Sequence, residues 1–162
     1  MSTQEPQSLR ELQARYPYQF DGPWLEIEVA LGWMPLFSQL CADVDLALDA
    51  DTYGFSWSQI KEKFGSARFY CRFGGREPVP CDYRTDRNHS RNYRQVVMEV
   101  FNLTEQAEEA TLSICLACGK AGSRDSTGGY LLVLCPEHQV QRQRSVAGQP
   151  LFVWKTLNDV NI

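Results

Sequence analysis

The sequence predicts an α+β fold, with two main helices and a β-hairpin in the body and a small metal-binding module towards the C-terminus. Three observations support this fold class. Two long segments carry apolar residues at helical spacing, and two short segments around a turn alternate apolar and polar residues. Near the C-terminus, cysteine and histidine residues form two pairs at metal-ligand spacing. We therefore divide the chain into an α+β body with a flexible N-terminus (1–111), a metal-binding module (112–144) and a C-terminal docking segment (145–162).

The first third of the chain predicts a polar start, a short strand and a helix. Residues 1–15 are polar and rich in glutamine, so a frayed or short helical start is expected. Alternation of apolar and acidic residues over 25–29 indicates a strand. A helix is expected from near Pro35, with Asp45 and Asp49 on its outer side. Its apolar stripe consists of Leu36, Phe37, Leu40, Val44 and Leu48.

The middle of the chain predicts a hairpin and a second long helix. Period-two alternation on both sides of the turn-forming residues 61–66 indicates two antiparallel strands within 55–73. A loop rich in proline, glycine and arginine separates them from a helix over about 90–111. We expect this helix to bury Tyr93, Val96, Val97, Val100, Phe101 and Ala107. The apolar run 151–154 is expected to form a final strand or docking segment.

Two pairs of residues predict a metal site, namely Cys115 with Cys118 and Cys135 with His138. Two residues between paired cysteines allow a tight knuckle that directs both sulfur atoms to one ion. Gly119 suits the positive φ that such a turn tends to require. Pro136 suits the first turn of a helix, because its missing N–H would have no partner there. His138 then lies about one turn beyond Cys135, on the same side of the helix.

The four ligands favour one structural zinc ion. A structural site closes with four protein ligands, whereas a catalytic zinc keeps one position for water. Three thiolates also make the bound ion a poor Lewis acid. A knuckle, a hairpin and a helix in this order would form a treble-clef-like zinc finger. A redox Cys-x-x-Cys motif would need no second pair, and a reversible disulfide leaves His138 unexplained.

Composition places the protein in a reducing compartment. The chain has no run of about 18 apolar residues of the kind that spans a membrane. Its first residues lack the basic and apolar regions of a signal peptide. Six cysteines then favour metal binding and free thiols over disulfides, and we expect Cys41, Cys71 and Cys81 to be such thiols. The expected location is the cytoplasm.

Charge is distributed unevenly along the chain. Residues 1–52 contribute −7 to the net charge of −4, residues 53–100 contribute +4 and residues 101–162 contribute −1. Four arginines that recur every three or four residues form what we name the arginine cluster: Arg84, Arg87, Arg91 and Arg94. Arginines among aromatic residues can hold phosphate and stack on bases. We favour the alternative that they pair with nearby acids, because the acidic composition is unlike that of nucleic-acid binders.

Three blocks of sequence carry a resemblance to a known family. They are Gly32-Trp33-Met34-Pro35-Leu36 with Leu40-Cys41-Ala42-Asp43, then Gln59 to Gly65 with Arg68-Phe69-Tyr70, then the two ligand pairs. In this order the blocks resemble a family of uncharacterised proteins common in phages and prophages. The resemblance spans about residues 32–138. It implies a small accessory protein in the bacterial cytoplasm, of phage or prophage origin, with a zinc-stabilised C-terminal end.

We expect a binding protein rather than an enzyme. The sequence has no Gly-rich phosphate loop and no nucleophile with a plausible histidine partner. Accessory proteins of the kind that the resemblance implies often occupy a host protein, including the machinery of defence. The acidic N-terminal third is suited to a basic surface. The expected function is therefore binding of a host protein, with inhibition of a defence system as one form of it; the alternative is a nucleic-acid-binding zinc-finger protein that uses the arginine cluster.

Overall fold

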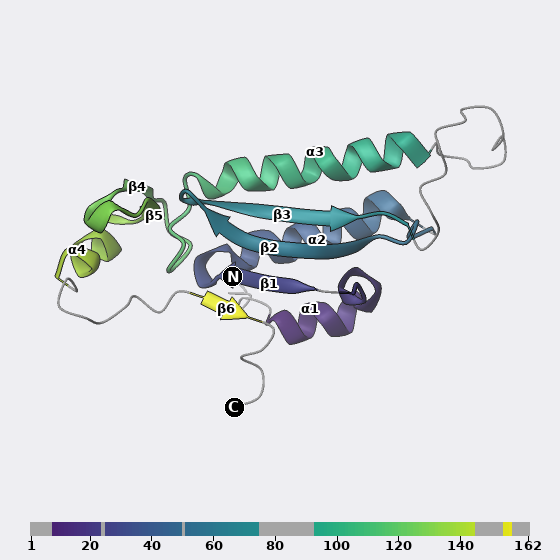
Figure 1. The fold of residues 1–162 in the computed structure, drawn as a ribbon, viewed down its shortest axis with the longest axis horizontal. Coiled ribbons are helices and arrows are strands. Elements are labelled where there is room, and N and C mark those ends of the chain that lie inside the picture. Colours follow the sequence, from purple (N-terminus) through teal and green to yellow (C-terminus); the bar gives the residue numbers. More distant parts are fainter. Residues whose placement is uncertain (1–7, 24, 50, 75–92, 145–153, 157–162) are drawn as a thin grey trace, which may run out of the picture.

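The computed structural model describes residues 8–23, 25–49, 51–74, 93–144 and 154–156 (Figure 1). It shows the mixed α+β architecture that the sequence predicts. The helices are α1 (Leu9–Arg15), α2 (Met34–Leu48), α3 (Tyr93–Thr111) and α4 (Pro136–Arg144), with short 3-10 turns at Pro17–Phe20, Leu31–Trp33 and Thr127–Gly129. The strands are β1 (Glu26–Ala30), β2 (Ser56–Lys63), β3 (Ser66–Arg72), β4 (Ser123–Asp125), β5 (Leu132–Leu134) and β6 (Trp154–Thr156).

Four strands form the main sheet, in the order β3-β2-β1-β6. The predicted hairpin is confirmed, because β2 and β3 pair in antiparallel register from Ser56 opposite Arg72 to Lys63 opposite Ser66. Strand β1 is parallel to β2, and β6 is antiparallel to β1. The predicted final strand is thus present at Trp154–Thr156, whereas residues 151–153 lie outside the described part of the chain.

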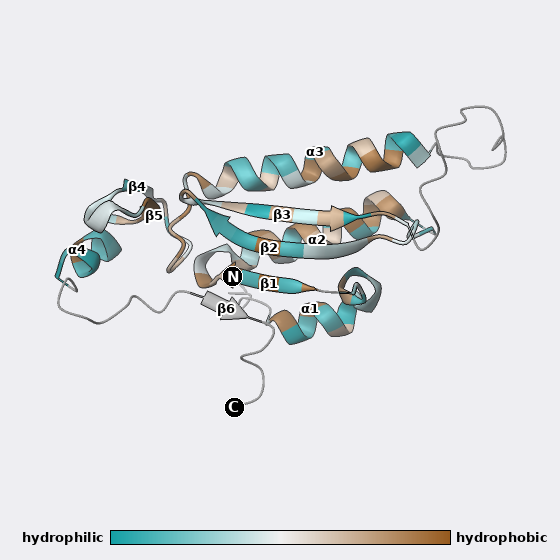
Figure 2. Cartoon of the chain, viewed as in Figure 1, coloured by the Kyte–Doolittle hydropathy of each residue, from teal (hydrophilic) through white to brown (hydrophobic). Residues whose placement is uncertain are grey.

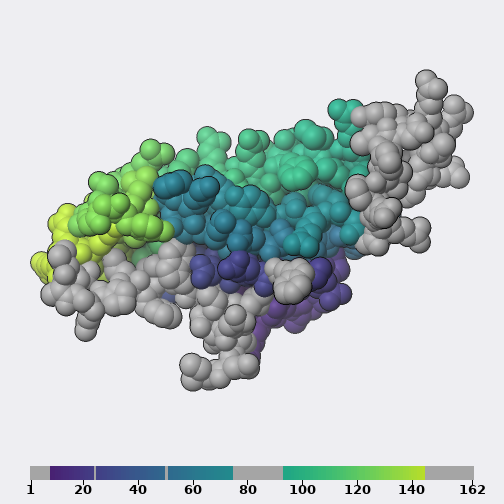
Figure 3. All heavy atoms as spheres, viewed as in Figure 1, coloured from purple at the N-terminus to yellow at the C-terminus, as the bar shows by residue number. Residues whose placement is uncertain are grey.

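One face of the sheet carries the hydrophobic core. Phe37 of α2 stacks on Phe69 of β3 with ring centroids 5.7 Å apart, and its ring also lies 5.6 Å from that of Trp57 on β2. Cys41 is fully buried beside them, as expected for a small apolar side chain. Buried Gln19 is satisfied by hydrogen bonds to the Cys41 carbonyl and from the Trp57 indole. The opposite face of the sheet is polar, and Figure 3 shows β2 and β3 side chains on the molecular surface there.

Helix α3 covers the outer edge of β3. The Ala67 amide donates to Thr111 Oγ1 at 2.9 Å, and the Phe69 amide donates to Glu108 Oε1 at 2.8 Å. Unpaired amides on an edge strand are open to pairing with another chain. Side chains from the last two turns of α3 therefore complete the edge of the sheet and fix the position of the helix along it.

The predicted inner face of α3 needs a correction at its first half. Val96, Val100 and Ala107 are buried as expected, and Val97 is half-buried. Tyr93 and Phe101 are not buried, since 48% and 46% of their surface is exposed. Tyr93 follows the buried stripe at helical spacing but lies in the first turn of α3, where its ring contacts Tyr53 and Phe73 at the end of the sheet. Phe101 lies to one side of the stripe, and its ring contacts Phe73. Figure 2 shows hydrophobic and hydrophilic residues alternating along α3.

The β2–β3 turn consists of Phe64 and Gly65, both with positive φ. A two-residue hairpin loop with two positive φ values is the type I′ turn, which favours glycine or asparagine. Gly65 fits this requirement, and its amide is held by Glu62 Oε1 at 2.6 Å. Phe64 adopts a conformation that costs a bulky residue about 1–2 kcal/mol, and 70% of its surface is exposed.

Candidate metal centre

The two predicted ligand pairs come together in space. Their ligand atoms all lie within 4.8 Å of one another. Cys118 Sγ is 3.8 Å from Cys135 Sγ, and His138 Nδ1 is 3.1 Å from Cys135 Sγ and 3.5 Å from Cys115 Sγ. Zinc–sulfur bonds of about 2.3 Å and zinc–nitrogen bonds of about 2.0–2.1 Å in a tetrahedron separate two sulfurs by about 3.8 Å, and sulfur and nitrogen by about 3.5 Å. The four side chains can therefore bind one metal ion.

The first ligand pair lies on a tight turn that follows α3. The Gly119 amide donates to the Cys115 carbonyl at 2.8 Å, and the Cys115 amide donates to the Lys120 carbonyl at 2.7 Å. Gly119 has a φ of 78°, which confirms the expectation from sequence. An isolated bridge between Ile114 and Ala121 closes the turn at its base. This turn is the knuckle that two residues between cysteines allow.

The second pair lies where β5 passes into α4. Pro136 is the first residue of the helix, and the Gln139 amide makes a helical hydrogen bond to the Cys135 carbonyl at 2.9 Å. His138 therefore stands in the first turn, three residues beyond Cys135, and both side chains face the knuckle. A knuckle, the β4–β5 hairpin and α4 follow one another in the order of a treble-clef-like zinc finger.

The thiols of this site differ in how readily they ionise. Burial opposes the thiolate of Cys135, but the backbone N–H and ring of His138 and the neighbouring thiols lower its pKa to about 6. Partial burial and the thiols of Cys115 and Cys135 raise the pKa of Cys118 to about 11. A metal ion binds thiolates and displaces their protons. Of these two thiols, Cys135 therefore ionises more readily than Cys118, and a bound ion would displace the proton of Cys118.

The knuckle packs directly on the start of α2. The Gly32 amide donates to the Leu116 carbonyl at 2.8 Å, and Trp33 Nε1 donates to the Ile114 carbonyl at 3.3 Å. A Cβ atom on Gly32 would lie 2.0 Å from the Cys115 carbonyl oxygen and 2.4 Å from the Gly119 nitrogen. Cys115, Leu116 and Cys135 belong to the same buried cluster as the body. Sequence reasoning missed this role of Gly32, for which the available signal was a glycine just before a predicted helix.

A largely buried ion pair holds α4 against the hairpin of the module. Arg142 Nη1 lies 3.1 Å from Asp125 Oδ1, and the two side chains are 12% and 6% exposed. Arg142 also donates to the backbone carbonyls of Asp125 and Tyr130. Burial opposes the charge on Asp125, but hydrogen bonds from Thr127 and the Arg142 guanidinium lower its pKa. Nothing in the spacing of the sequence distinguished this pair from ordinary surface charges.

The arginine cluster is largely outside the described residues. Arg84, Arg87 and Arg91 lie there, and so does the predicted start of the second helix before Tyr93. Arg94 is described, and its side chain is exposed in the first turn of α3. The cluster as a binding site therefore stays a prediction.

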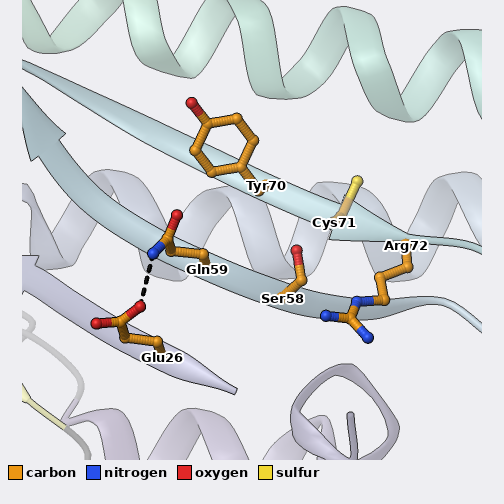
Figure 4. A pocket seen from close by; sticks show the side chains of 6 residues that line it. All are labelled: Glu26, Ser58, Gln59, Tyr70, Cys71 and Arg72. Carbon is orange, nitrogen blue, oxygen red and sulfur yellow. Dashed lines mark hydrogen bonds between the residues drawn. The ribbon is translucent and has the colours of Figure 1, made fainter. Parts of the chain in front are cut away.

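A shallow groove crosses the polar face of the sheet (Figure 4). It has a volume of about 460 Å³ and is lined by Glu26, Ser58, Gln59, Tyr70, Cys71 and Arg72. Gln59 donates to Glu26 Oε2 at 2.6 Å, and the side chains of Glu26, Gln59 and Tyr70 stand in a row across three strands. The lining combines an acid, a base and neutral polar groups, and it offers no histidine or second metal cluster among these six residues.

Comparison of the chain with protein-family models, with curated proteins and with solved structures found no match. Among the residues that the structure describes, no helix is both long enough and apolar enough to cross a membrane.

Proposed function

We propose that the metal centre binds one zinc ion with a structural role. Four protein ligands are the number that a tetrahedral zinc ion takes, so a bound ion would have no open position for water or substrate. The ligand set, three sulfurs and one imidazole nitrogen, is the kind that zinc takes in structural sites. The contacts of the knuckle with Gly32 and Trp33 couple that ion to the body of the protein.

Elemental analysis tests the identity and number of the ion. We expect about one zinc per chain in protein purified without added metal, since the four ligands make one site. Cys118→Ser should lose the zinc and lower the melting temperature, whereas Cys71→Ser, a half-buried thiol outside the site, should keep it. Native protein that is folded and free of metal would refute the proposal.

We propose that the protein acts by binding a host protein, as an accessory protein of phage or prophage type. The phage origin comes from the resemblance of its sequence blocks, and inhibition of a defence system is the form of action that we expect. The observation that carries the binding proposal is the polar face of the sheet. There β1 exposes Glu26, which lines the groove, and Glu28, two residues further along the same strand; both belong to the acidic N-terminal third of the chain. A partner with a basic surface would be complementary to these acids.

Affinity purification of the tagged protein from the bacterial host tests this proposal. We expect one host protein to be enriched, with the same yield after nuclease treatment. The double substitution Glu26→Lys and Glu28→Lys should abolish the enrichment, because it reverses the charge of the proposed contact. The matched control is Glu109→Lys with Glu137→Lys, an equal change of charge at two exposed acids off the sheet face. The role of this face would be contradicted if both double variants lost the partner equally, and also if neither of them lost it.

The nucleic-acid alternative has its own readout. If the arginine cluster holds phosphates, binding should weaken with salt by a logarithmic slope of about −0.7 to −0.9 for each contact. We expect no complex at physiological salt. A gel shift with single-stranded and double-stranded DNA, repeated with Arg87→Glu and Arg91→Glu together, decides the question. Tight, salt-sensitive binding that this double variant loses would move the protein into the nucleic-acid class.

A further inference from the structure

The outer face of α3 carries a short stripe of four exposed side chains. Arg94, Met98, Phe101 and Glu105 follow at intervals of four, three and four residues, which places them on one side of the helix. Met98 is 53% exposed and Phe101 is 46% exposed, while Arg94 and Glu105 are exposed at the two ends. Val96 and Val100 face the core from the other side of the same turns. Along the helix, the stripe therefore consists of a basic residue, two apolar residues and an acidic residue, in that order.

Beside an antiparallel second copy of the same helix, this order sets each base opposite an acid and the apolar residues opposite one another. We propose that two copies of the chain associate through α3, antiparallel, as a two-fold symmetric dimer. With the two-fold axis between Glu99 and Val100, Met98 of each copy meets Phe101 of the other, and Arg94 of each copy meets Glu105 of the other. In a two-fold interface, a contact from residue i of one copy to residue j of the other is matched by a contact from residue j to residue i. The same surface must therefore complement itself.

Helix geometry permits all four contacts at once. With a rise of about 1.5 Å per residue, Met98 and Phe101 lie about 2 Å to either side of the axis, and Arg94 and Glu105 about 8 Å. Antiparallel helices that pack at about 8–10 Å keep such positions within side-chain reach. The apolar pair then occupies the centre, and an Arg–Glu ion pair closes each end. Arginine pairs with carboxylates through two parallel hydrogen bonds, which fixes the register of the helices.

Another exposed apolar residue in the described chain does not meet this condition. Leu46 on α2 is 75% exposed, more than Met98 or Phe101. Its neighbours one turn away on the helix are Asp43 and Asp49, both acidic. Pairing two copies through Leu46 would bring like charges together, which is unfavourable. The choice of α3 thus rests on its charge order and not on exposure alone, and Leu46 supplies a matched control.

Sedimentation velocity on the metal-loaded chain of 162 residues tests the dimer. We expect a monomer–dimer equilibrium over about 1 to 300 µM, the range that suits an interface at the small end of the known sizes. Met98→Glu should raise the dissociation constant by about tenfold or more, because it buries a charge at the centre. Leu46→Glu should leave it unchanged. Circular dichroism checks that each variant keeps its helices.

A charge exchange tests the register. Arg94→Glu and Glu105→Arg should each weaken the dimer by about tenfold, because each sets like charges against one another at both ends. The double variant should restore the native dissociation constant, because the same two pairs form with their charges exchanged. A native chain that stays monomeric over the whole range would overturn the proposal, and so would a dimer that these changes do not affect. Host-protein capture through Glu26 and Glu28 is measured separately, so failure of the dimer does not bear on that function.

Discussion

Gly32 shows how a single residue ties the metal centre to the body. Its φ does not require glycine, because no positive φ is found there. The requirement is space, since backbone atoms of Cys115, Cys118 and Gly119 occupy the place of a Cβ. Backbone atoms of a knuckle cannot move without moving the sulfur ligands. The residue that couples the two parts of the protein is therefore one with no side chain of its own.

We expect Gly32→Ala to destabilise the protein by about 3 kcal/mol or more, the upper end of overpacking costs, because backbone atoms at 2.0 and 2.4 Å leave no room for a methyl group. It should also weaken metal binding. Denaturant unfolding and a competitive chelator titration measure the two effects. The control is Gly128→Ala, where φ is 74° but no atom lies within 4 Å of a Cβ, so only about 1 kcal/mol of backbone strain is expected. Equal costs at the two glycines would show that the contact at Gly32 relaxes freely.

The buried ion pair of Asp125 and Arg142 is expected to contribute to the stability of the protein. Asp125→Asn should destabilise by about 3–5 kcal/mol at neutral pH, because it leaves the Arg142 charge buried without its counter-charge. The folded pKa of Asp125 is lowered, so its contribution is complete above its unfolded value of about 3.9 and is lost only below it. Unfolding measured at pH 8 and pH 6 should therefore give the same loss. A loss that shrinks between those pH values would mean that the carboxylate titrates near neutrality.

At the scale of elements, the periodicity of the sequence predicted the features that depend on a single segment. It missed the features that depend on contacts between two segments. The apolar stripe of α2 and the alternation around Phe64 were sufficient for the helix and the hairpin, because each pattern matches its own backbone period. Ligand spacing was sufficient to predict that the four candidate metal ligands come together. The burial of Tyr93 and Phe101 was predicted wrongly, because the pattern defines a stripe but not how far the sheet extends beneath it. Contacts between elements, such as those of Gly32, leave no periodic signal.

Helix α2 allows its three faces to be compared by substitution. Leu40→Ala should cost about 2–5 kcal/mol, because the side chain is buried in the core. Leu46→Ala, at an exposed position, should stay within about 0.5 kcal/mol. Asp45 was expected on the outer side, but it is half-buried and accepts a hydrogen bond from the Tyr18 hydroxyl at 2.8 Å. Asp45→Ala should therefore cost an intermediate amount, about 1 kcal/mol, in denaturant unfolding. Another ranking of the three variants would mean that the helix is rotated from this orientation.

At the scale of the whole molecule, the metal centre stands at the junction of three parts of the chain. Gly32 and Trp33 join it to α2, the Tyr130 hydroxyl donates to Glu62 at the end of β2, and Thr111 links the end of α3 to β3. A domain boundary near residue 112 stays a prediction from sequence. Because contacts cross this boundary, we expect removal of a bound metal to destabilise the residues on both sides of it.

Hydrogen exchange after chelation measures how far that effect extends. We expect protection to fall first within 112–144, where the amides of Cys115 and Leu116 are held by the knuckle and by β5. The Gly32 amide should follow, because its acceptor is the Leu116 carbonyl, while the amides around Val44 stay protected by a core that does not contain the metal. Cys118→Ser should reproduce the same pattern without a chelator. Loss confined to 112–144 would show that the module unfolds alone despite Gly32, and equal loss around Val44 would show that module and body unfold as one cooperative unit.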